Sequence, residues 1–235
     1  MAKITSINGR IIHNSRGTKT IEVDVISDNQ HLGRTSAPSG ASVGKYESVS
    51  FPEGGPEESL RILNENSKKF LEFESSDLKS IDETLKAIDQ TSNYSKIGGG
   101  LAYAITIASM ESASKAVEKQ LFELISEQDE YRFPIPIGNI LGGGVHAGPG
   151  TPDIQEILIS APGAKTIRDA IETNFKVHKE LRNVIEKADP NFTNGRGDEG
   201  GWAPKCDNIK ALELCTKACE NLGYTLGNEV SLGVD

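Results

Sequence analysis

An alternation of apolar and acidic residues near the N-terminus most narrows the folds open to this chain. Ile21, Val23 and Val25 are separated by Glu22 and Asp24, which is the period-2 pattern of a strand with one face toward water. Two neighbouring segments also look like strands, so the sequence predicts three strands early in the chain. They cover residues 4–12, 20–26 and about 31–36.

Helical patterns come next, with no strand between them. They cover residues 57–73, 77–90 and 101–126. In the last of these, Leu101 and Ile105 lie on an apolar face that Leu121 and Ile125 resume. Strands followed by helices, without β-α-β alternation, predict an α+β domain with an antiparallel sheet. We expect this domain to span residues 1–130.

The pattern changes in the second part of the chain, beyond an acidic, polar stretch at residues 127–131. Strand-like segments now alternate with helical ones, which predicts the first part of a β/α barrel over residues 131–235. In that fold the functional residues lie at strand ends and in the loops that follow them, and a whole barrel takes about 250 residues. We therefore expect an incomplete barrel. Its predicted strands cover 135–141, 154–159 and 229–235, and its predicted helices cover 166–188 and 207–222.

Charge and hydropathy exclude several classes of function. The 235 residues carry a net charge of −9, with 25 basic and 34 acidic residues and no long basic run, which disfavours binding to nucleic acid or to an anionic membrane. No apolar stretch approaches the roughly 20 residues of a membrane span, and the N-terminus lacks the apolar core of a signal peptide. We expect no membrane span and a cytoplasmic location.

The three cysteines do not form an evident disulfide framework, because their number is odd and no secretion signal precedes them. Cys215 and Cys219 are four residues apart and could present two thiolates to a metal from one helix face. They also belong to an apolar helical stripe that includes Ile209 and Leu222. Because cysteine is commonly a small core residue, we favour the interpretation that both pack in the core.

A glycine-rich acidic loop is the strongest candidate for a functional site. Asp198 and Glu199 are adjacent, and glycines stand at positions 195, 197, 200 and 201. Glycine weakens helices and strands but allows unusual backbone angles and close approach, so the two carboxylates can be aimed at a small ligand. The alternative is an acidic turn that only faces water.

Two further loops carry polar residues between small ones. Residues 37–47 read A-P-S-G-A-S-V-G-K-Y-E, a flexible, hydroxyl-rich composition that suits a lid over a phosphate or a metal. Residues 142–148 read G-G-G-V-H-A-G, and Gln155 and Glu156 follow them. His146 stands between small residues, where its imidazole can reach a ligand.

These motifs in this order resemble enolase, the enzyme that dehydrates 2-phosphoglycerate to phosphoenolpyruvate, and the resemblance covers nearly the whole chain. The S-G-A-S loop, the G-G-V-H-A-G loop with its Q-E pair, the G-D-E-G-G loop and the final L-G-V-D segment carry it. The turn at residues 13–18 resembles the family signature D-S-R-G-N-P-T, although Asn14 replaces the acid and Lys19 the proline. Lys45 and Tyr46 look more like archaeal members.

The resemblance implies a role for each matching residue. Glu199 would be the catalytic proton donor and Glu156 would assist it. Mg²⁺, bound by Asp235 and, on closure of the lid, by Ser42, would offset the charge of the intermediate. Family sites of this kind pair Mg²⁺ with a Lys or His base, and Mn²⁺ accepts the same oxygen ligands. The residues expected to contact the substrate are His146, Gln155, Glu156, Ser39, Gly40 and Ala41.

The sequence departs from the family pattern in two places. The segment between His146 and Glu156 is one residue longer than the common pattern, so the contacts of that loop can differ. The family's lysine base, two further metal carboxylates and an S-H-R-S segment would lie after Asp235. We therefore expect these 235 residues to be the N-terminal portion of an enolase, which alone neither folds fully nor turns over substrate. A homodimer is implied by the family.

Three other interpretations stay open. A racemase or cycloisomerase of the same superfamily is disfavoured by the S-G-A-S and G-D-E-G-G loops. A truncated, non-catalytic binding protein derived from enolase is the main alternative. An unrelated glycine-rich phosphate-binding domain rests only on the number of glycines.

Overall fold

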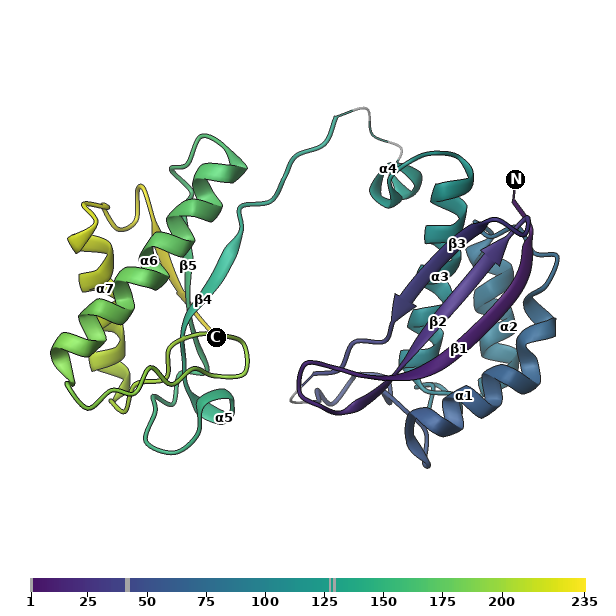
Figure 1. Cartoon of the computed structure of the whole chain (residues 1–235), viewed down its shortest axis with the longest axis horizontal. Coiled ribbons are helices and arrows are strands. Elements are labelled where there is room, and N and C mark those ends of the chain that lie inside the picture. The colour runs from purple at the N-terminus through teal and green to yellow at the C-terminus, as the bar shows by residue number, and fades with distance from the viewer. Residues whose placement is uncertain (1, 41–42, 127, 129) are drawn as a thin grey trace. The chain divides into compact units, whose positions relative to one another are not determined.

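The computed structural model describes residues 2–40, 43–126, 128 and 130–235. The chain divides into two compact units, residues 1–129 and 130–235, and each is described by itself (Figure 1). None of the helices in the described part of the chain is long and apolar enough to cross a membrane.

The first unit begins with an antiparallel sheet in the order β1-β2-β3. Its strands are β1 (Ile4–His13), β2 (Lys19–Ser27) and β3 (His31–Ser36). The helical elements are α1 (Gly55–Asn66), a 3₁₀ turn η1 (Ser67–Phe70), α2 (Leu78–Asp89), α3 (Gly99–Ala116) and α4 (Leu121–Ile125). The predicted α+β arrangement is confirmed.

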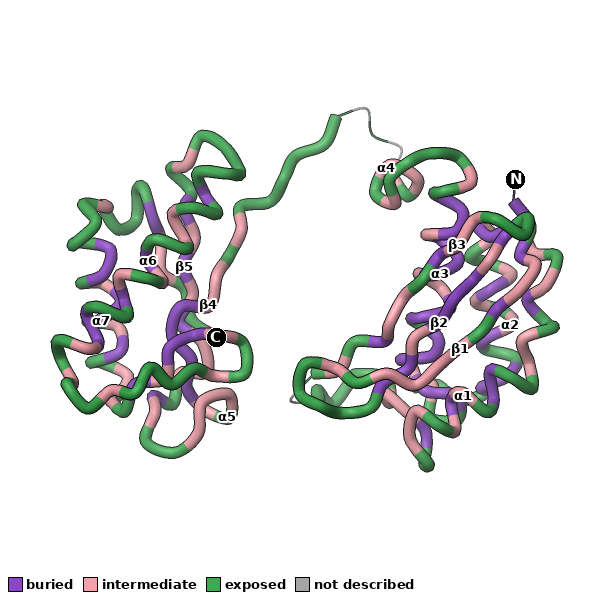
Figure 2. The backbone as a smooth tube through the Cα atoms, in the orientation of Figure 1, coloured by how far each residue is buried: buried purple, intermediate pink, exposed green. Residues whose placement is uncertain are grey.

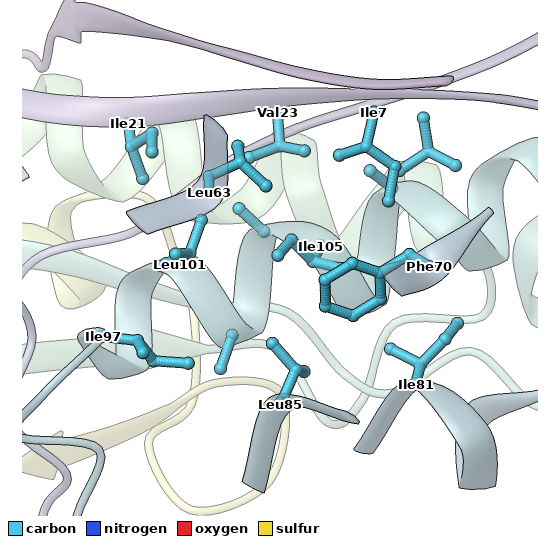
Figure 3. Close-up of a cluster of buried hydrophobic side chains, with 14 of the residues drawn as sticks. Ile7, Ile21, Val23, Leu63, Phe70, Ile81, Leu85, Ile97, Leu101 and Ile105 are labelled. Atoms are coloured by element: carbon cyan, nitrogen blue, oxygen red, sulfur yellow. The ribbon is translucent and has the colours of Figure 1, made fainter. Parts of the chain in front are cut away.

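The core of this unit lies between the sheet and its helices, as the buried segments in Figure 2 show. Ile21 and Val23, two of the alternating residues, are fully buried and point toward Leu63 and Leu101 from the helices (Figure 3). Helix α3 lies so close to β3 that a Cβ on Gly33 would stand 1.8 Å from the carbonyl oxygen of Ala108. A glycine is therefore required where these two elements meet.

The opposite face of the sheet carries charges that neutralise one another. Arg34 and Arg10 both donate to the Asp24 carboxylate, with Nε of Arg34 at 2.6 Å and Nη1 of Arg10 at 2.8 Å. The Arg34 hydrogen bond and the two positive charges hold the pKa of Asp24 far below its usual range, against the opposing effect of burial. The acidic residues of the period-2 pattern thus form ion pairs.

Two predicted helices end earlier than their apolar patterns suggest. The first ends with η1 at Phe70, because the chain then pairs with β1: Ile4 N–H donates to Phe73 O (2.8 Å) and Glu72 N–H donates to Ile4 O (3.0 Å). The prediction of one helix over 101–126 is also wrong. Helix α3 stops at Ala116, since Glu118 has a left-handed φ of 55°.

Helix α4 is a separate element because it has its own N-terminal cap. The side chain of Glu123 accepts a hydrogen bond from the backbone N–H of Gln120 at 2.7 Å, as part of a capping box. The apolar face of α3 does not continue here, since Ile125 is 63% exposed. Apolar spacing alone did not reveal this break.

The second unit holds a three-stranded sheet in the order β4-β5-β6. Its elements are β4 (Ile137–Gly142), α5 (Gly144–Ala147), β5 (Glu156–Ser160), α6 (Ile167–Ala188), α7 (Asn208–Asn221) and β6 (Ser231–Val234). Both strand pairs are antiparallel. This differs from a plain β/α alternation, in which one helix connects two parallel strands. Here two consecutive helices, α6 and α7, connect β5 to β6, and β6 runs antiparallel to β5.

Helices α6 and α7 pack together and bury the cysteines. Cys215 and Cys219 are fully buried in the apolar core of this unit, and burial raises the pKa of Cys219 to about 11. The interpretation that they pack in the core is confirmed. The predicted stripe was partly wrong, because Ile209 is 72% exposed, and the buried face of α7 instead consists of Ala211, Leu214, Cys215, Ala218 and Cys219.

Candidate functional site

One end of the β4-β5-β6 sheet gathers the candidate residues of the second unit. Because β5 runs against both neighbours, its first residue, Glu156, lies where β4 and β6 end. Gly142 of β4 is its partner in the register. On the other side, Glu156 and Asp235 exchange backbone hydrogen bonds of 3.2 and 3.0 Å. The antiparallel register, which the sequence did not predict, is what places Glu156 beside Asp235.

The glycine-rich acidic loop is hydrogen-bonded to β4 at the same end of the sheet. Trp202 bonds to the outer edge of β4, donating from its backbone N–H to Ile140 O and accepting at its carbonyl from Gly142 N–H, each at 3.0 Å. A Cβ on Gly197 would stand 2.8 Å from the carbonyl oxygen of His146. The glycine at 197 therefore lets the loop approach the backbone of α5 closely.

His146 is held by Asp198. The two side chains are joined by a hydrogen bond of 2.7 Å between Nδ1 of the imidazole and Oδ1 of the carboxylate. The backbone N–H of Asp198 also donates to the carbonyl of His146, at 3.2 Å. The Asp198 hydrogen bond raises the pKa of His146 above its ordinary value, although burial opposes it.

Glu199 lies between three polar side chains. Nδ2 of Asn139 donates to its Oε2 at 3.2 Å, and Nδ1 of His146 is 3.8 Å from its Oε1. Its carboxylate also forms a hydrogen bond with Glu156. A partly exposed glutamate in contact with a second carboxyl group is suited to giving or taking a proton at a bound ligand.

The surroundings of Glu156 alter its acidity. Burial raises its pKa first, and the hydrogen bond to Glu199 with the charges of Glu199 and Asp235 raises it further. The positive charge of His146 opposes this effect. The protonated form of Glu156 is therefore favoured beside Glu199, because two neighbouring carboxylates resist carrying full charge together.

The donor set fits a hard divalent cation. The side-chain ligand atoms of His146, Asp198 and Glu199 lie within 4.8 Å of one another, and Asp235 adjoins Glu156. Carboxylate oxygens are the ligands that Mg²⁺ takes in proteins. The negative charges of Glu199 and Asp235, which add to the effect of burial on the pKa of Glu156, are what a cation would offset. The imidazole is less suited to that ion, and its Nδ1 is already engaged by Asp198.

The remaining predicted residues are placed as follows. Gln155 precedes β5, and its carbonyl accepts from Gly143 N–H at 2.9 Å. Ser39 and Gly40 belong to the first unit, where Ser39 accepts a hydrogen bond of 2.8 Å at its Oγ from Nδ2 of Asn14. Ser39 and Gly40 are thus in a different unit from Glu199, and the predicted residues Ala41 and Ser42 lie outside the described residues.

Sequence reasoning missed several residues that shape the site. Asn139 could have been found from the sequence, because it is a polar residue within the apolar segment of β4. No sequence pattern pointed to His178, because it lies in the middle of helix α6. Its Nε2 is 3.1 Å from the carbonyl oxygen of Gly200, and its ring stacks on Trp202 with centroids 4.9 Å apart. Arg196 covers the same indole, 4.2 Å from its centroid.

The fold and the site define a class: an α+β domain followed by the start of a β/α barrel with acidic groups at one sheet end. Family models agree in both units. The model for the enolase N-terminal domain matches residues 4–125, and the model for the enolase C-terminal TIM barrel domain matches residues 130–235. The chain belongs to the enolase family, and the part of the barrel that it contains is incomplete.

Curated relatives carry the same name. The chain is 41% identical over 233 residues to the enolase of Methanothermobacter thermautotrophicus and 40% identical over 233 residues to that of Methanosphaera stadtmanae. Each alignment covers 99% of this chain but 56% of the relative. An enolase 2 of Pseudomonas syringae pv. syringae is 34% identical over 243 residues. The chain thus spans little more than half the length of these relatives.

Proposed function

We propose that this chain supplies the acid side of an enolase active site, for the Mg²⁺-dependent, reversible dehydration of 2-phosphoglycerate to phosphoenolpyruvate. The observation that carries the proposal is the contact of Glu199 with Glu156, beside the His146–Asp198 pair and Asp235, in a member of the enolase family. We further propose that residues 1–130 form the N-terminal domain of the family and that residues 131–235 form the first part of its barrel.

In this proposal Glu199 protonates the hydroxide that leaves C3 of the substrate. The raised pKa of Glu156 favours retention of a proton next to Glu199. Asn139 donates a hydrogen bond to the Glu199 carboxylate, and Nδ1 of His146 lies 3.8 Å from it. Gln155 contacts the substrate from the position just before β5.

A bound Mg²⁺ would stabilise the negative charge that develops when the proton next to the substrate carboxylate is removed. Asp235 is the residue of this chain proposed to hold the structural ion, and Ser42 is proposed for the second ion. Ser39, Gly40 and Ala41 belong to the loop proposed to close over the substrate. The lysine base is assigned to the part of the barrel outside this chain.

The test uses the part of the Methanothermobacter thermautotrophicus relative that follows its aligned segment, here called the C-terminal complement. We expect no turnover of 2-phosphoglycerate with Mg²⁺ by the 235-residue chain alone, and phosphoenolpyruvate formation when the two polypeptides are co-expressed and purified as a complex. Glu199→Gln should lower the turnover of that complex by about 10²–10⁴-fold, the range of general acid catalysis. An active Glu199→Gln complex would refute the assigned role.

The main alternative is a non-catalytic binding protein derived from enolase, and a wild-type complex without turnover would favour it. Location and assembly follow from the resemblance alone: we propose a cytoplasmic protein that forms a homodimer in its whole form. Sedimentation of the active complex tests the dimer.

A further inference from the structure

The dipeptide Asn-Gly occurs twice in the chain, as Asn8-Gly9 and as Asn194-Gly195. Asparagine before glycine is prone to spontaneous deamidation, because glycine has no side chain to hinder attack of its backbone nitrogen on the preceding side-chain amide. The attack requires rotation of the peptide group that joins the two residues. The fold therefore decides which of the two dipeptides can react.

The first dipeptide is held inside strand β1. Asn8 stands opposite Asp24 of β2 in the register. Gly9 stands opposite Val23, and a Cβ on Gly9 would lie 2.7 Å from a methyl carbon of Leu63 in α1. Asn8 is nevertheless exposed. Exposure to water therefore does not protect this dipeptide, but strand pairing and packing do.

The second dipeptide lies in the glycine-rich acidic loop, outside the helices and strands, and both of its residues are exposed. Asn194 has a left-handed φ of 59°, a conformation that asparagine and glycine adopt more readily than other residues. The amide group between Asn194 and Gly195 forms no hydrogen bond with any residue that the structure describes. This peptide group can therefore rotate without the loss of a hydrogen bond.

We propose that Asn194 is a site of spontaneous deamidation, which converts the acidic loop to an isoaspartyl form. The backbone nitrogen of Gly195 forms a bond to Cγ of Asn194, and Nδ2 leaves as ammonia with the proton of that nitrogen. Water then opens the resulting cyclic imide. Opening at Cγ gives aspartate, whereas opening at the backbone carbonyl carbon gives isoaspartate, in which the chain continues through Cγ.

The isoaspartyl form should disturb the loop, because it adds one carbon atom to the backbone just before Gly195. The carbonyl of Gly195 accepts a hydrogen bond from Ala203 N–H at 2.9 Å, and a longer backbone moves that carbonyl. The same loop carries Asp198 and Glu199. The free α-carboxylate of isoaspartate is the group that isoaspartyl methyltransferases esterify, so an enzyme of this class is the partner that fits the modified loop.

The experiment is incubation of the purified 235-residue chain in mildly alkaline buffer, with samples taken over several days. Peptide mapping by mass spectrometry measures aspartate and isoaspartate at both asparagines. In the folded chain we expect conversion at Asn194 to be at least about tenfold faster than at Asn8, because Asn8 must first be released by local opening of the sheet. In denaturant the two rates should become similar.

Gly195→Ala is the variant that tests the attack itself. Its Cβ would stand 4.0 Å from Ala203 O, so the loop accommodates it, but it lies beside the attacking nitrogen. We expect this variant to slow conversion at Asn194 at least about tenfold. The matched control is Gly233→Ala, which adds the same methyl group in β6 at 3.7 Å from Leu158 and should leave the rate unchanged. Circular dichroism checks the fold of each chain.

Two further measurements detect the isoaspartyl form and its effect. An isoaspartyl methyltransferase with a labelled methyl donor should label the aged wild-type chain and not the aged Gly195→Ala chain. Hydrogen exchange at the Ala203 amide should be faster in the isoaspartyl fraction, and an unchanged rate would refute the effect on the loop.

The proposal is overturned if neither asparagine converts, if Asn8 converts as fast as Asn194 in the folded chain, or if Gly195→Ala converts at the wild-type rate. An aged wild-type chain that the methyltransferase does not label would also overturn it. None of these measurements involves turnover of a substrate, so a failure of the proposed function would leave this proposal standing.

Discussion

Neighbouring side chains in the acidic loop have separate roles. Asp198 binds the imidazole of His146, whereas Glu199 contacts Asn139 and Glu156. Two adjacent carboxylates can point to different partners because glycines on both sides leave the backbone free to turn, with Gly200 at a φ of 88°. The loop therefore positions one acid and keeps the other available for a ligand.

His178, which contacts Gly200 and Trp202 of this loop, should make the fluorescence of Trp202 depend on pH. Burial lowers its pKa below the ordinary value, the nearby charge of Arg196 lowers it further, and the hydrogen bond to Gly200 O opposes both effects. Trp202, on which it stacks, is the chain's single tryptophan. We expect Trp202 fluorescence to stay constant as the pH falls to about 6.5, the ordinary pKa of histidine, and to change only below that value, when His178 becomes charged.

The sign of the stability effect follows from the same shift. Because the pKa of His178 is lower in the folded chain, the unfolded chain binds the proton first as the pH falls. The contribution of neutral His178 to the stability of the folded state is therefore present above a pH of about 6.5 and is lost below it. His178→Gln should remove the fluorescence transition. A midpoint above 6.5, or a transition that persists in the glutamine variant, would contradict this account.

At the scale of elements, the ends of helices and the directions of strands depend on packing and backbone conformation, which the periodicity of apolar residues does not reveal. The three strands of the first sheet were predicted close to their observed ends, since one face is buried and the other carries Glu22 and Asp24. The break at Glu118 was not predicted, because apolar residues recur at Leu121 as if the helix continued. The direction of β5 was also not predicted, because alternation is the same in parallel and antiparallel strands.

The contact between β3 and α3 gives a prediction at this scale. In Gly33→Ala the new Cβ would stand 1.8 Å from the backbone carbonyl oxygen of Ala108, and a helix backbone cannot rotate away as a side chain can. We expect overpacking to lower the free energy of unfolding by at least about 1–3 kcal/mol, measured by urea denaturation.

Gly233→Ala in β6 is the control for that measurement. Its Cβ would meet only the Leu158 side chain at an ordinary 3.7 Å, so its effect on the free energy of unfolding should be small. Equal midpoints for Gly33→Ala and the wild type would mean that α3 and β3 do not pack as closely as described.

At the scale of the molecule, the sequence singles out candidate residues but does not predict how they are arranged. Glu156, Glu199 and His146 were singled out from motifs, and the structure brings them together with Asp198. Their meeting depends on the register of β4 with β5 and on the attachment of Trp202 to β4. The hydrogen bonds that result, Asn139 with Glu199 and His146 with Asp198, join residues 60 and 52 positions apart. Local spacing carries no information on such contacts.

We propose that this chain supplies the acid of an enolase site and that the base belongs to the rest of the family's barrel. The most direct measurement compares two rates in the complex of the chain with the C-terminal complement: exchange of the C2 proton of 2-phosphoglycerate with deuterated water, and formation of phosphoenolpyruvate. Removal of the C2 proton does not require the acid, whereas departure of the hydroxide does. We predict that Glu199→Gln keeps the exchange near the wild-type rate and loses most of the dehydration. Loss of both rates in parallel would contradict the assignment of Glu199 as the acid.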